Sequence, residues 1–383
     1  MTRQPLLKSI RIQGYRPFGD FTAQFGPLEV LVGANGSGKS SLFEFLKFLR
    51  DGVRGDIPSE IVPGSIGQRI FHSPGPERFS WSVEVDFAGR PQVRYEGELM
   101  GPVGRWQLTL ETARTVYPAE EVMEAHEVAG WIRDPENRPE REEVGRRGRQ
   151  LMPAVATPSF TTLYNLAECM RGWRFYSGLD IATEKIRRSV PTEQEPVLQE
   201  DARNLSPILH FLYTEHQSVF DELQQLLRLV VPGFKGLRVR AYGGLGEVIG
   251  FWREEGVDTE LNLADLSDGI LRLICWMVLC LQPNPPSLIC IDEPDQGVHP
   301  RTLPILAGLF QKASERTQIL LATHSSYFLT QFDISRIAVL RKENGEAKFV
   351  KPQGSKVLTE NLKDFGSEEI EVMHRSDELE RLA

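Results

Sequence analysis

The chain has 383 residues, of which 40% are apolar and 25% charged, and its net charge is −9. It can bury a large core, in one large domain or two lobes, and its acidity argues against a globally basic nucleic-acid-binding protein but not against a local basic groove. No secretory signal opens the chain, no Cys-x-x-Cys pair occurs, and the longest apolar run, near residues 274–281, is too short to cross a membrane. We therefore expect a cytoplasmic protein without a membrane partner.

The first fifty residues predict a short antiparallel start to a mostly parallel sheet. Residues 7–12 and 21–25 alternate apolar and polar side chains, as half-buried strands do. Residues 28–32 (Leu-Glu-Val-Leu-Val) indicate a buried strand, and residues 41–50 indicate the helix that follows it.

A phosphate-binding loop lies between that strand and that helix. Residues 33–40 have the sequence Gly-Ala-Asn-Gly-Ser-Gly-Lys-Ser and fit the pattern G-x-x-x-x-G-K-[ST]. The glycines let backbone N–H groups point inward around phosphate oxygens, Lys39 would reach the β- and γ-phosphates, and the Ser40 hydroxyl would bind Mg²⁺. The predicted ATP-binding residues are Gly33, Ala34, Asn35, Gly36, Ser37, Gly38, Lys39, Ser40 and Ser41.

The middle of the chain combines short strands, a charged segment and helices. Period-two alternation predicts an antiparallel meander over residues 79–87, 93–98 and 106–111, and two more strands at 237–242 and 248–252. Residues 134–150 contain almost no apolar side chain and predict a solvated linker or mobile loop. Contact of Arg146, Arg147 and Arg149 with phosphates is the less favoured interpretation of this segment. Helical periodicity over residues 161–173 and 204–230 predicts a helical subdomain.

The last third of the chain alternates helices with buried strands, which predicts a parallel, doubly wound sheet. We expect helices at residues 267–281 and 302–314, and strands at 287–291, 318–322 and 337–340. The fold class is therefore an α/β P-loop NTPase with a mixed, mostly parallel sheet, an antiparallel β subdomain and an inserted helical subdomain. The expected parts are an N-terminal ATPase lobe (1–130), a charged linker with a helical insertion (131–235), a C-terminal ATPase lobe (236–345) and a charged tail (346–383).

Polar side chains follow two of these buried strands. Asp292 and Glu293 end the strand at 287–291, and ligands of open α/β sheets bind at the carboxyl ends of strands. Asp292 would hold Mg²⁺, directly or through water, and Glu293 would position or deprotonate an attacking water. His324 follows the next strand, where it would contact the γ-phosphate or orient that water. A polar cap of the strand end is the alternative for His324.

Residues 266–269 (Leu-Ser-Asp-Gly) mark the start of the helix that precedes the Asp-Glu strand. Ser267 is a good N-cap, Gly269 allows close approach of another backbone, and the helix dipole favours an anion in front of this end. A plain helix cap is the alternative interpretation.

The order of these motifs resembles that of ABC-type ATPases of the SMC/RecF-like branch. Within this branch the chain is most similar to stand-alone ATPases related to RecF and to the ATPase half of OLD-family nucleases. The similarity rests on residues 14–18 (Gly-Tyr-Arg-Pro-Phe), 266–272 and 291–300 (Ile-Asp-Glu-Pro-Asp-Gln-Gly-Val-His-Pro), together with the phosphate loop.

The resemblance implies that two subunits enclose two ATP molecules. Each site would take the phosphate loop, Asp292, Glu293 and His324 from one chain, and Ser267 and Gly269 of the other chain would contact the γ-phosphate. The family also has a glutamine on the Mg²⁺ side, for which Gln68 is the best candidate. The absence of a long coiled coil between Ser40 and Leu266 argues against an SMC protein proper, and the short sequence after His324 argues against a fused OLD-type nuclease.

The expected function is an ATPase that uses ATP and Mg²⁺, hydrolyses ATP slowly, and couples closure of a homodimer to a partner. The partner would be DNA, as in repair, or a separately encoded effector protein, as in anti-phage defence. The alternative is a scaffold or binding module that binds ATP without hydrolysing it, and the complete Asp292–Glu293 pair argues against that alternative.

Overall fold

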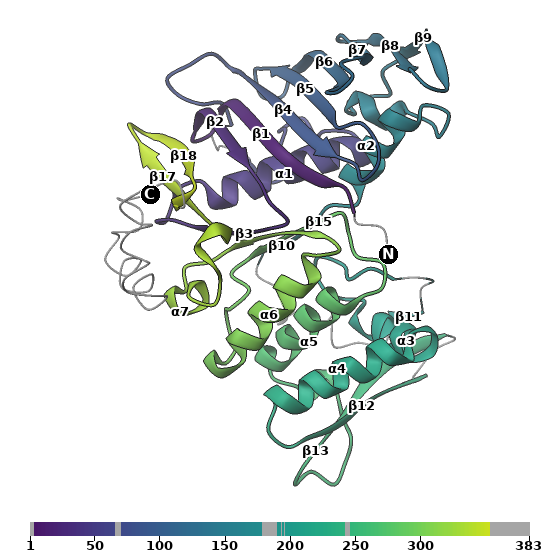
Figure 1. The fold of residues 1–383 in the computed structure, drawn as a ribbon, viewed down its shortest axis with the longest axis vertical. Helices are drawn as coiled ribbons and strands as arrows, with labels where there is room; N and C mark the ends of the chain where they lie inside the picture. Colours follow the sequence, from purple (N-terminus) through teal and green to yellow (C-terminus); the bar gives the residue numbers. More distant parts are fainter. Residues whose placement is uncertain are drawn as a thin grey trace.

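The computed structural model describes residues 4–65, 70–177, 190–192, 194, 196–241 and 246–352. These residues form three sheets with helices between and around them (Figure 1). The largest sheet is antiparallel, has eight strands and follows the order β2-β1-β4-β5-β6-β7-β8-β9. Its strands are β1 (Leu6–Tyr15), β2 (Phe18–Gln24), β4 (Arg78–Asp86), β5 (Val93–Met100), β6 (Gln107–Thr115), β7 (Glu121–Ala125), β8 (Ala129–Asp134) and β9 (Arg138–Gly145).

A six-stranded sheet with the order β10-β15-β16-β3-β17-β18 lies at the centre of the molecule. All of its neighbouring strands are parallel except the last pair, β17 and β18. Its strands are β3 (Leu28–Val32), β10 (Arg174–Ser177), β15 (Leu288–Asp292), β16 (Gln318–Ala322), β17 (Ile337–Glu343) and β18 (Glu346–Val350). The predicted fold class, with its mixed and mostly parallel sheet, is confirmed.

The third sheet is small and lies beside two helices of the inserted segment. It contains β11 (Val190–Pro191), β12 (Phe234–Ala241), β13 (Glu247–Glu254) and β14 (Leu261–Asn262). The α-helices are α1 (Lys39–Arg54), α2 (Thr161–Arg171), α3 (Leu205–Glu215), α4 (Gln217–Val230), α5 (Asp268–Leu281), α6 (Leu303–Ala313) and α7 (Ser326–Leu329). Short 3₁₀ helices occupy Met152–Val155, Leu263–Asp265, Pro300–Thr302 and Ile334–Arg336.

The central strands are buried on both faces, and their alternating side chains enter two different cores. In β3, Leu31 belongs to the core shared with α1, α2 and the eight-stranded sheet, whereas Val30 and Val32 belong to the core shared with α3 to α6. Figure 1 shows the same layers, with α1 between the two large sheets and α5 and α6 on the opposite face of the central sheet. Burial on both faces explains why these strands are continuous apolar runs in the sequence.

The prediction of a solvated linker over residues 134–150 is wrong. Strand β9 pairs antiparallel with β8 and forms an edge of the eight-stranded sheet, although most of its side chains are exposed. Arg146 is not solvated either, because its guanidinium forms a buried ion pair with Glu111, whose side chain is 0% exposed. An exposed edge strand has no apolar alternation, so the pattern that identifies a half-buried strand was missing here.

Two further sequence predictions need correction. Strands β1 and β2 do not begin the mostly parallel sheet, since they pair within the antiparallel sheet. The segment expected as a charged tail begins with an ordered strand, β18, which pairs with β17. Within the described residues, no helix combines the length and the apolar character that a membrane crossing requires.

Candidate active site

Three strands of the central sheet end at one edge and bring the predicted site residues together. β3 leads into the phosphate loop, β15 into Asp292 and Glu293, and β16 into Thr323 and His324. The parallel register pairs Asp292 with Ala322, and Ala322 with Leu31, so the three ends lie at one level. A cavity of about 190 Å³ at this edge is lined by residues 35–41 and by Asp292, Glu293 and His324.

The phosphate loop has the backbone conformation of an anion-binding nest. Gly36 and Gly38 have φ angles of 75° and 115°, which L-residues rarely adopt. Gly33 has a different role: a Cβ at this position would lie 2.0 Å from the carbonyl oxygen of Leu340, so Gly33 lets β3 and β17 approach each other. The loop thus combines a cradle that faces the cavity with a tight contact to the neighbouring strand.

Two side chains of the loop are arranged to receive phosphate. Lys39 Nζ donates to the carbonyl oxygens of Gly33 at 2.6 Å and Ala34 at 3.3 Å, and its side chain is buried against the loop. The Ser37 hydroxyl is buried without a hydrogen-bond partner. A bound phosphate would supply acceptors to both groups, and this is the observation that fits the loop to ATP.

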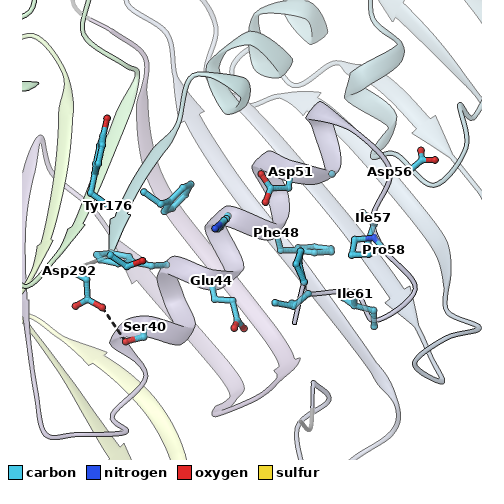
Figure 2. A pocket seen from close by; sticks show the side chains of 17 residues that line it. Ser40, Glu44, Phe48, Asp51, Asp56, Ile57, Pro58, Ile61, Tyr176 and Asp292 are labelled. Carbon is cyan, nitrogen blue, oxygen red and sulfur yellow. Dashed lines mark hydrogen bonds between the residues drawn. The ribbon is translucent and has the colours of Figure 1, made fainter. Parts of the chain in front are cut away.

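Ser40 and Asp292 form the candidate metal side of the site (Figure 2). Ser40 Oγ donates to Asp292 Oδ2 at 3.4 Å, across the gap between the start of α1 and the end of β15. A hydroxyl and a carboxylate are the oxygen ligands that Mg²⁺ prefers in proteins, so this pair fits a magnesium ion. Burial raises the pKa of the Asp292 carboxyl, and Lys39, the Ser40 hydrogen bond and His324 oppose this increase.

Glu293 directly follows Asp292 in the sequence and has an unusual backbone conformation. Its φ is 56°, in the left-handed region, and its N–H donates to the carbonyl oxygen of Ala322 at 2.8 Å. Such conformations cost free energy in non-glycine residues and cluster at functional sites. Burial raises the pKa of the Glu293 carboxyl, and the nearby Asp295 and Asp292 raise it further, which makes this group a stronger base than an exposed glutamate.

His324 reaches the same cavity from the end of β16. Its Nε2 lies 3.8 Å from Oε1 of Glu293, and both side chains remain partly exposed to the cavity. Thr323, directly before it, is fully buried and donates its hydroxyl proton to Asp295 Oδ1 at 2.7 Å. The sequence analysis identified His324 but not Thr323, because a buried threonine at a strand end carries no motif of its own.

Ser267 and Gly269, the residues predicted to contact the ATP of a second chain, lie at the start of α5, which we call the signature helix, and they do not line the phosphate-loop cavity of their own chain. Ser267 caps α5 by accepting from the N–H of Ile270 at 3.4 Å, and its side chain is exposed. Gly269 packs against the loop that follows Glu293, since a Cβ there would lie 2.5 Å from the carbonyl oxygen of Gly297. A plain helix cap therefore describes Ser267 within one chain, and its role toward a second chain remains a prediction.

A second cavity of about 350 Å³ continues from the metal side along α1 (Figure 2). Ser40 and Asp292 lie at one end, and Phe48 and Ile57 are among its apolar lining residues. Ser177, at the end of β10, also lines it and is the register partner of Asp292. The sequence analysis missed Ser177, because the short strand β10 has no recognisable pattern. Gln68, the predicted metal-side glutamine, lies outside the described residues.

Comparisons with known proteins agree with this geometry. A family model described as "AAA domain, putative AbiEii toxin, Type IV TA system" matches residues 170–330, and one described as "AAA ATPase domain" matches residues 6–62. The SMC head bound to the C-terminal winged-helix domain of ScpA is 15% identical, with a TM-score of 0.57, and the match covers 90% of this chain and 97% of that one. The SMC head with an extended coiled coil from Pyrococcus furiosus, bound to the C-terminal domain of ScpA, is 13% identical, with a TM-score of 0.55, and covers 94% and 100%.

The two matched segments contain the two halves of the candidate site. Residues 6–62 hold the phosphate loop, and residues 170–330 hold the signature helix, the Asp-Glu pair and His324. At such low identity the SMC heads show the shared fold alone, and the family models show that the two matched segments resemble AAA ATPase domains. The chain therefore shares the fold of SMC heads, and two of its segments, residues 6–62 and 170–330, are similar to ATPase-type family models.

Proposed function

We propose that the chain binds ATP with Mg²⁺, hydrolyses it, and closes as a homodimer around two nucleotides to act on a partner. The observation that carries this proposal is the meeting of the phosphate loop, Asp292, Glu293 and His324 around one cavity. These groups come from three strand ends of one sheet, those of β3, β15 and β16, where an α/β fold places its ligand.

Each side chain has a definite task in the proposed hydrolysis. The loop N–H groups and Lys39 bind the phosphates, and Ser40 and Asp292 hold the ion that neutralises part of their charge. Glu293 accepts a proton from water while the water oxygen attacks the γ-phosphorus. The bond from that phosphorus to the β–γ bridging oxygen breaks, so ADP and phosphate are the products. His324, whose Nε2 lies 3.8 Å from Oε1 of Glu293, orients the water or the γ-phosphate.

The signature helix supports the proposed dimer. Ser267 and Gly269 stand at the positive end of α5, Ser267 is exposed, and neither residue lines the cavity of its own chain. A second copy could present this helix end to the γ-phosphate, where the helix dipole and the serine hydroxyl would stabilise negative charge. ATP would then favour the closed dimer, and hydrolysis would release it.

We favour a separately encoded effector protein as the partner and retain DNA as the alternative. The net charge is −9, and the described cations on the outer face of the eight-stranded sheet include four arginines that each lie within 4.0 Å of a carboxylate. Paired cations are poorly suited to neutralise phosphates. The pairs are Arg11–Asp20, Arg78–Glu98, Arg94–Glu84 and Arg114–Glu96. The matched toxin-system model favours a role in anti-phage or toxin–antitoxin systems over DNA repair.

Phosphate release separates an ATPase from a scaffold that only binds ATP. We expect the wild-type protein to release phosphate, and Glu293→Gln to lose at least about 100-fold in kcat while its affinity for ATP is kept, because only proton transfer is removed. Glu315→Gln is the matched control, since Glu315 is exposed and lies outside the cavity. Equal inactivity of wild type and Glu293→Gln, with ATP still bound, would instead establish the scaffold.

A salt titration distinguishes the two kinds of partner. A DNA-binding ATPase should bind a fluorescent duplex in the presence of ATP, with an affinity that falls steeply as salt rises. We expect no such binding at physiological salt if the partner is a protein. Tight, salt-dependent duplex binding would overturn the preference for an effector protein without affecting the ATPase proposal.

A further inference from the structure

The segment after Asp292, residues 293–297, is held in one conformation by its own backbone and by its neighbours. We call it the carboxylate loop. The N–H of Gln296 donates to the carbonyl oxygen of Glu293 at 3.1 Å, and the N–H of Val298 donates to that of Asp295 at 3.1 Å. Together with the bond from Glu293 N–H to Ala322, these contacts fix a tight turn directly after the candidate base.

One side chain connects this loop to the segment that carries His324. Thr323 Oγ1 donates to Asp295 Oδ1 at 2.7 Å and accepts from the N–H of Ser325 at 3.0 Å. The Thr323 hydroxyl therefore makes two bonds, one to the carboxylate loop and one to the backbone N–H of Ser325, the residue after His324. These two bonds restrain Thr323 and Ser325, the two residues that flank His324 in the sequence, and thereby the backbone from which the His324 side chain projects.

The same loop contacts the signature helix at two points. Trp276, in the middle of α5 and 1% exposed, donates its indole N–H to the carbonyl oxygen of Pro294 at 3.0 Å. Nearer the start of α5, Gly269 packs against the carbonyl oxygen of Gly297 with no room for a side chain. The carboxylate loop, which contains Glu293, thus contacts both the helix proposed to serve the second chain's ATP and Thr323, the residue before His324.

We infer that Thr323 is a positioning residue, whose hydroxyl holds His324 against Glu293 through Asp295 and so connects the reacting groups to the signature helix. This inference rests on the proposed ATPase function. Thr323 is fully buried and does not line the cavity, so it acts through its neighbours and does not touch ATP. Loss of its hydroxyl would let His324 move relative to Glu293, and a misplacement of about 1 Å can reduce a rate about 100-fold.

The test compares Thr323→Val, which keeps the shape and removes the hydroxyl, with Thr323→Ser, which keeps the hydroxyl. We expect Thr323→Val to lower kcat about 10- to 100-fold with a KM for ATP within about threefold of wild type, and Thr323→Ser to restore most of kcat. A purely structural role would instead lower the melting temperature and ATP affinity of both variants together. If Thr323→Val does not fold, the same comparison is made between Asp295→Ala and Asp295→Asn. Only asparagine keeps an oxygen that can accept the bond from the Thr323 hydroxyl.

A second measurement does not depend on turnover. The N–H of Ser325 donates to the Thr323 hydroxyl, so hydrogen exchange of the segment 323–328 in nucleotide-free protein reports this bond directly. We expect faster exchange at Ser325 in Thr323→Val and wild-type exchange in Thr323→Ser. Unchanged exchange in Thr323→Val would contradict the positioning role even if the wild-type protein proved inactive as an ATPase.

The last comparison tests whether Thr323 acts on turnover through His324. In a His324→Ala background, adding Thr323→Val should change kcat by less than about twofold, because the group that Thr323 positions is already absent. Independent, multiplying losses would overturn the inference while leaving the ATPase proposal intact. A wild-type protein without phosphate release would contradict the proposed function, and the exchange experiment would then decide the inference alone.

Discussion

The phosphate loop and the carboxylate loop face the same cavity but are held in place in different ways. The phosphate loop is continuous in sequence, and much of its support is local: Lys39 bonds to Gly33 and Ala34 within the same loop. The carboxylate loop is supported by side chains distant in sequence, Trp276 from α5 and Thr323 from β16. The side-chain bonds of Lys39 thus stay within the phosphate loop, whereas the carboxylate loop adds to its own backbone turn two side-chain bonds from distant elements.

This difference suggests a division of labour. A loop with much local support can keep its shape for the common part of a nucleotide, its phosphates, when other elements move. A loop held by two other elements changes when those elements move, so it is suited to link hydrolysis with closure of a dimer. Variants in the two loops should therefore fail in different ways.

The largest effect is expected at Lys39. Lys39→Ala should weaken ATP binding about 100-fold, because charge-assisted hydrogen bonds contribute about 1.5–3 kcal/mol and Lys39 lies in the loop itself. Isothermal titration calorimetry with ATP and Mg²⁺ measures the loss. Lys47→Ala is the control. Lys47 lies about two turns after Lys39 in the same helix, its side chain is exposed, and it lines the second cavity but not the phosphate-loop cavity. An unchanged ATP affinity in Lys39→Ala would contradict the assignment of the loop.

A pair of glycine variants sharpens the account of the phosphate loop. Gly33→Ala should destabilise the fold by about 3 kcal/mol, because its Cβ would collide with the carbonyl oxygen of Leu340 and such overpacking typically costs 1–3 kcal/mol in addition to backbone strain. Gly36→Ala meets no atom within 4 Å, so it should cost only about 1 kcal/mol, from its positive φ. Urea unfolding of both variants measures the difference. Equal losses would show that contact with β17 is not what requires Gly33.

A smaller effect than that of Gly33→Ala is expected at Trp276. Trp276→Phe leaves the buried carbonyl oxygen of Pro294 without its donor, which should reduce the free energy of unfolding by about 1–2 kcal/mol. Affinity for ATP should stay as in the wild type, since the phosphate loop does not use this bond, while kcat should fall. Urea unfolding and phosphate release measure the two effects. A fall in ATP affinity with unchanged kcat would contradict the division between the two loops.

The sequence was informative where function depends on contiguous residues. The phosphate loop, the Asp-Glu strand end, His324 and the parallel sheet follow from short motifs and from short apolar runs, which are typical of strands buried on both faces. Thr323, Trp276 and Ser177 were not predicted to act, because each gains its place from a partner far along the chain. Strand β9 was missed for a related reason: an exposed edge strand is specified by its neighbour β8 and not by its own side chains.

The central claim is that ATP is bound between two copies of this chain. Size-exclusion chromatography with multi-angle light scattering on Glu293→Gln, with and without ATP and Mg²⁺, tests it most directly. We predict a dimer with ATP and a monomer without it, and a monomer in both conditions when Ser267→Arg is added to a protein that still binds ATP. A mass that ignores ATP, or an ATP-dependent dimer that survives Ser267→Arg, would contradict the claim.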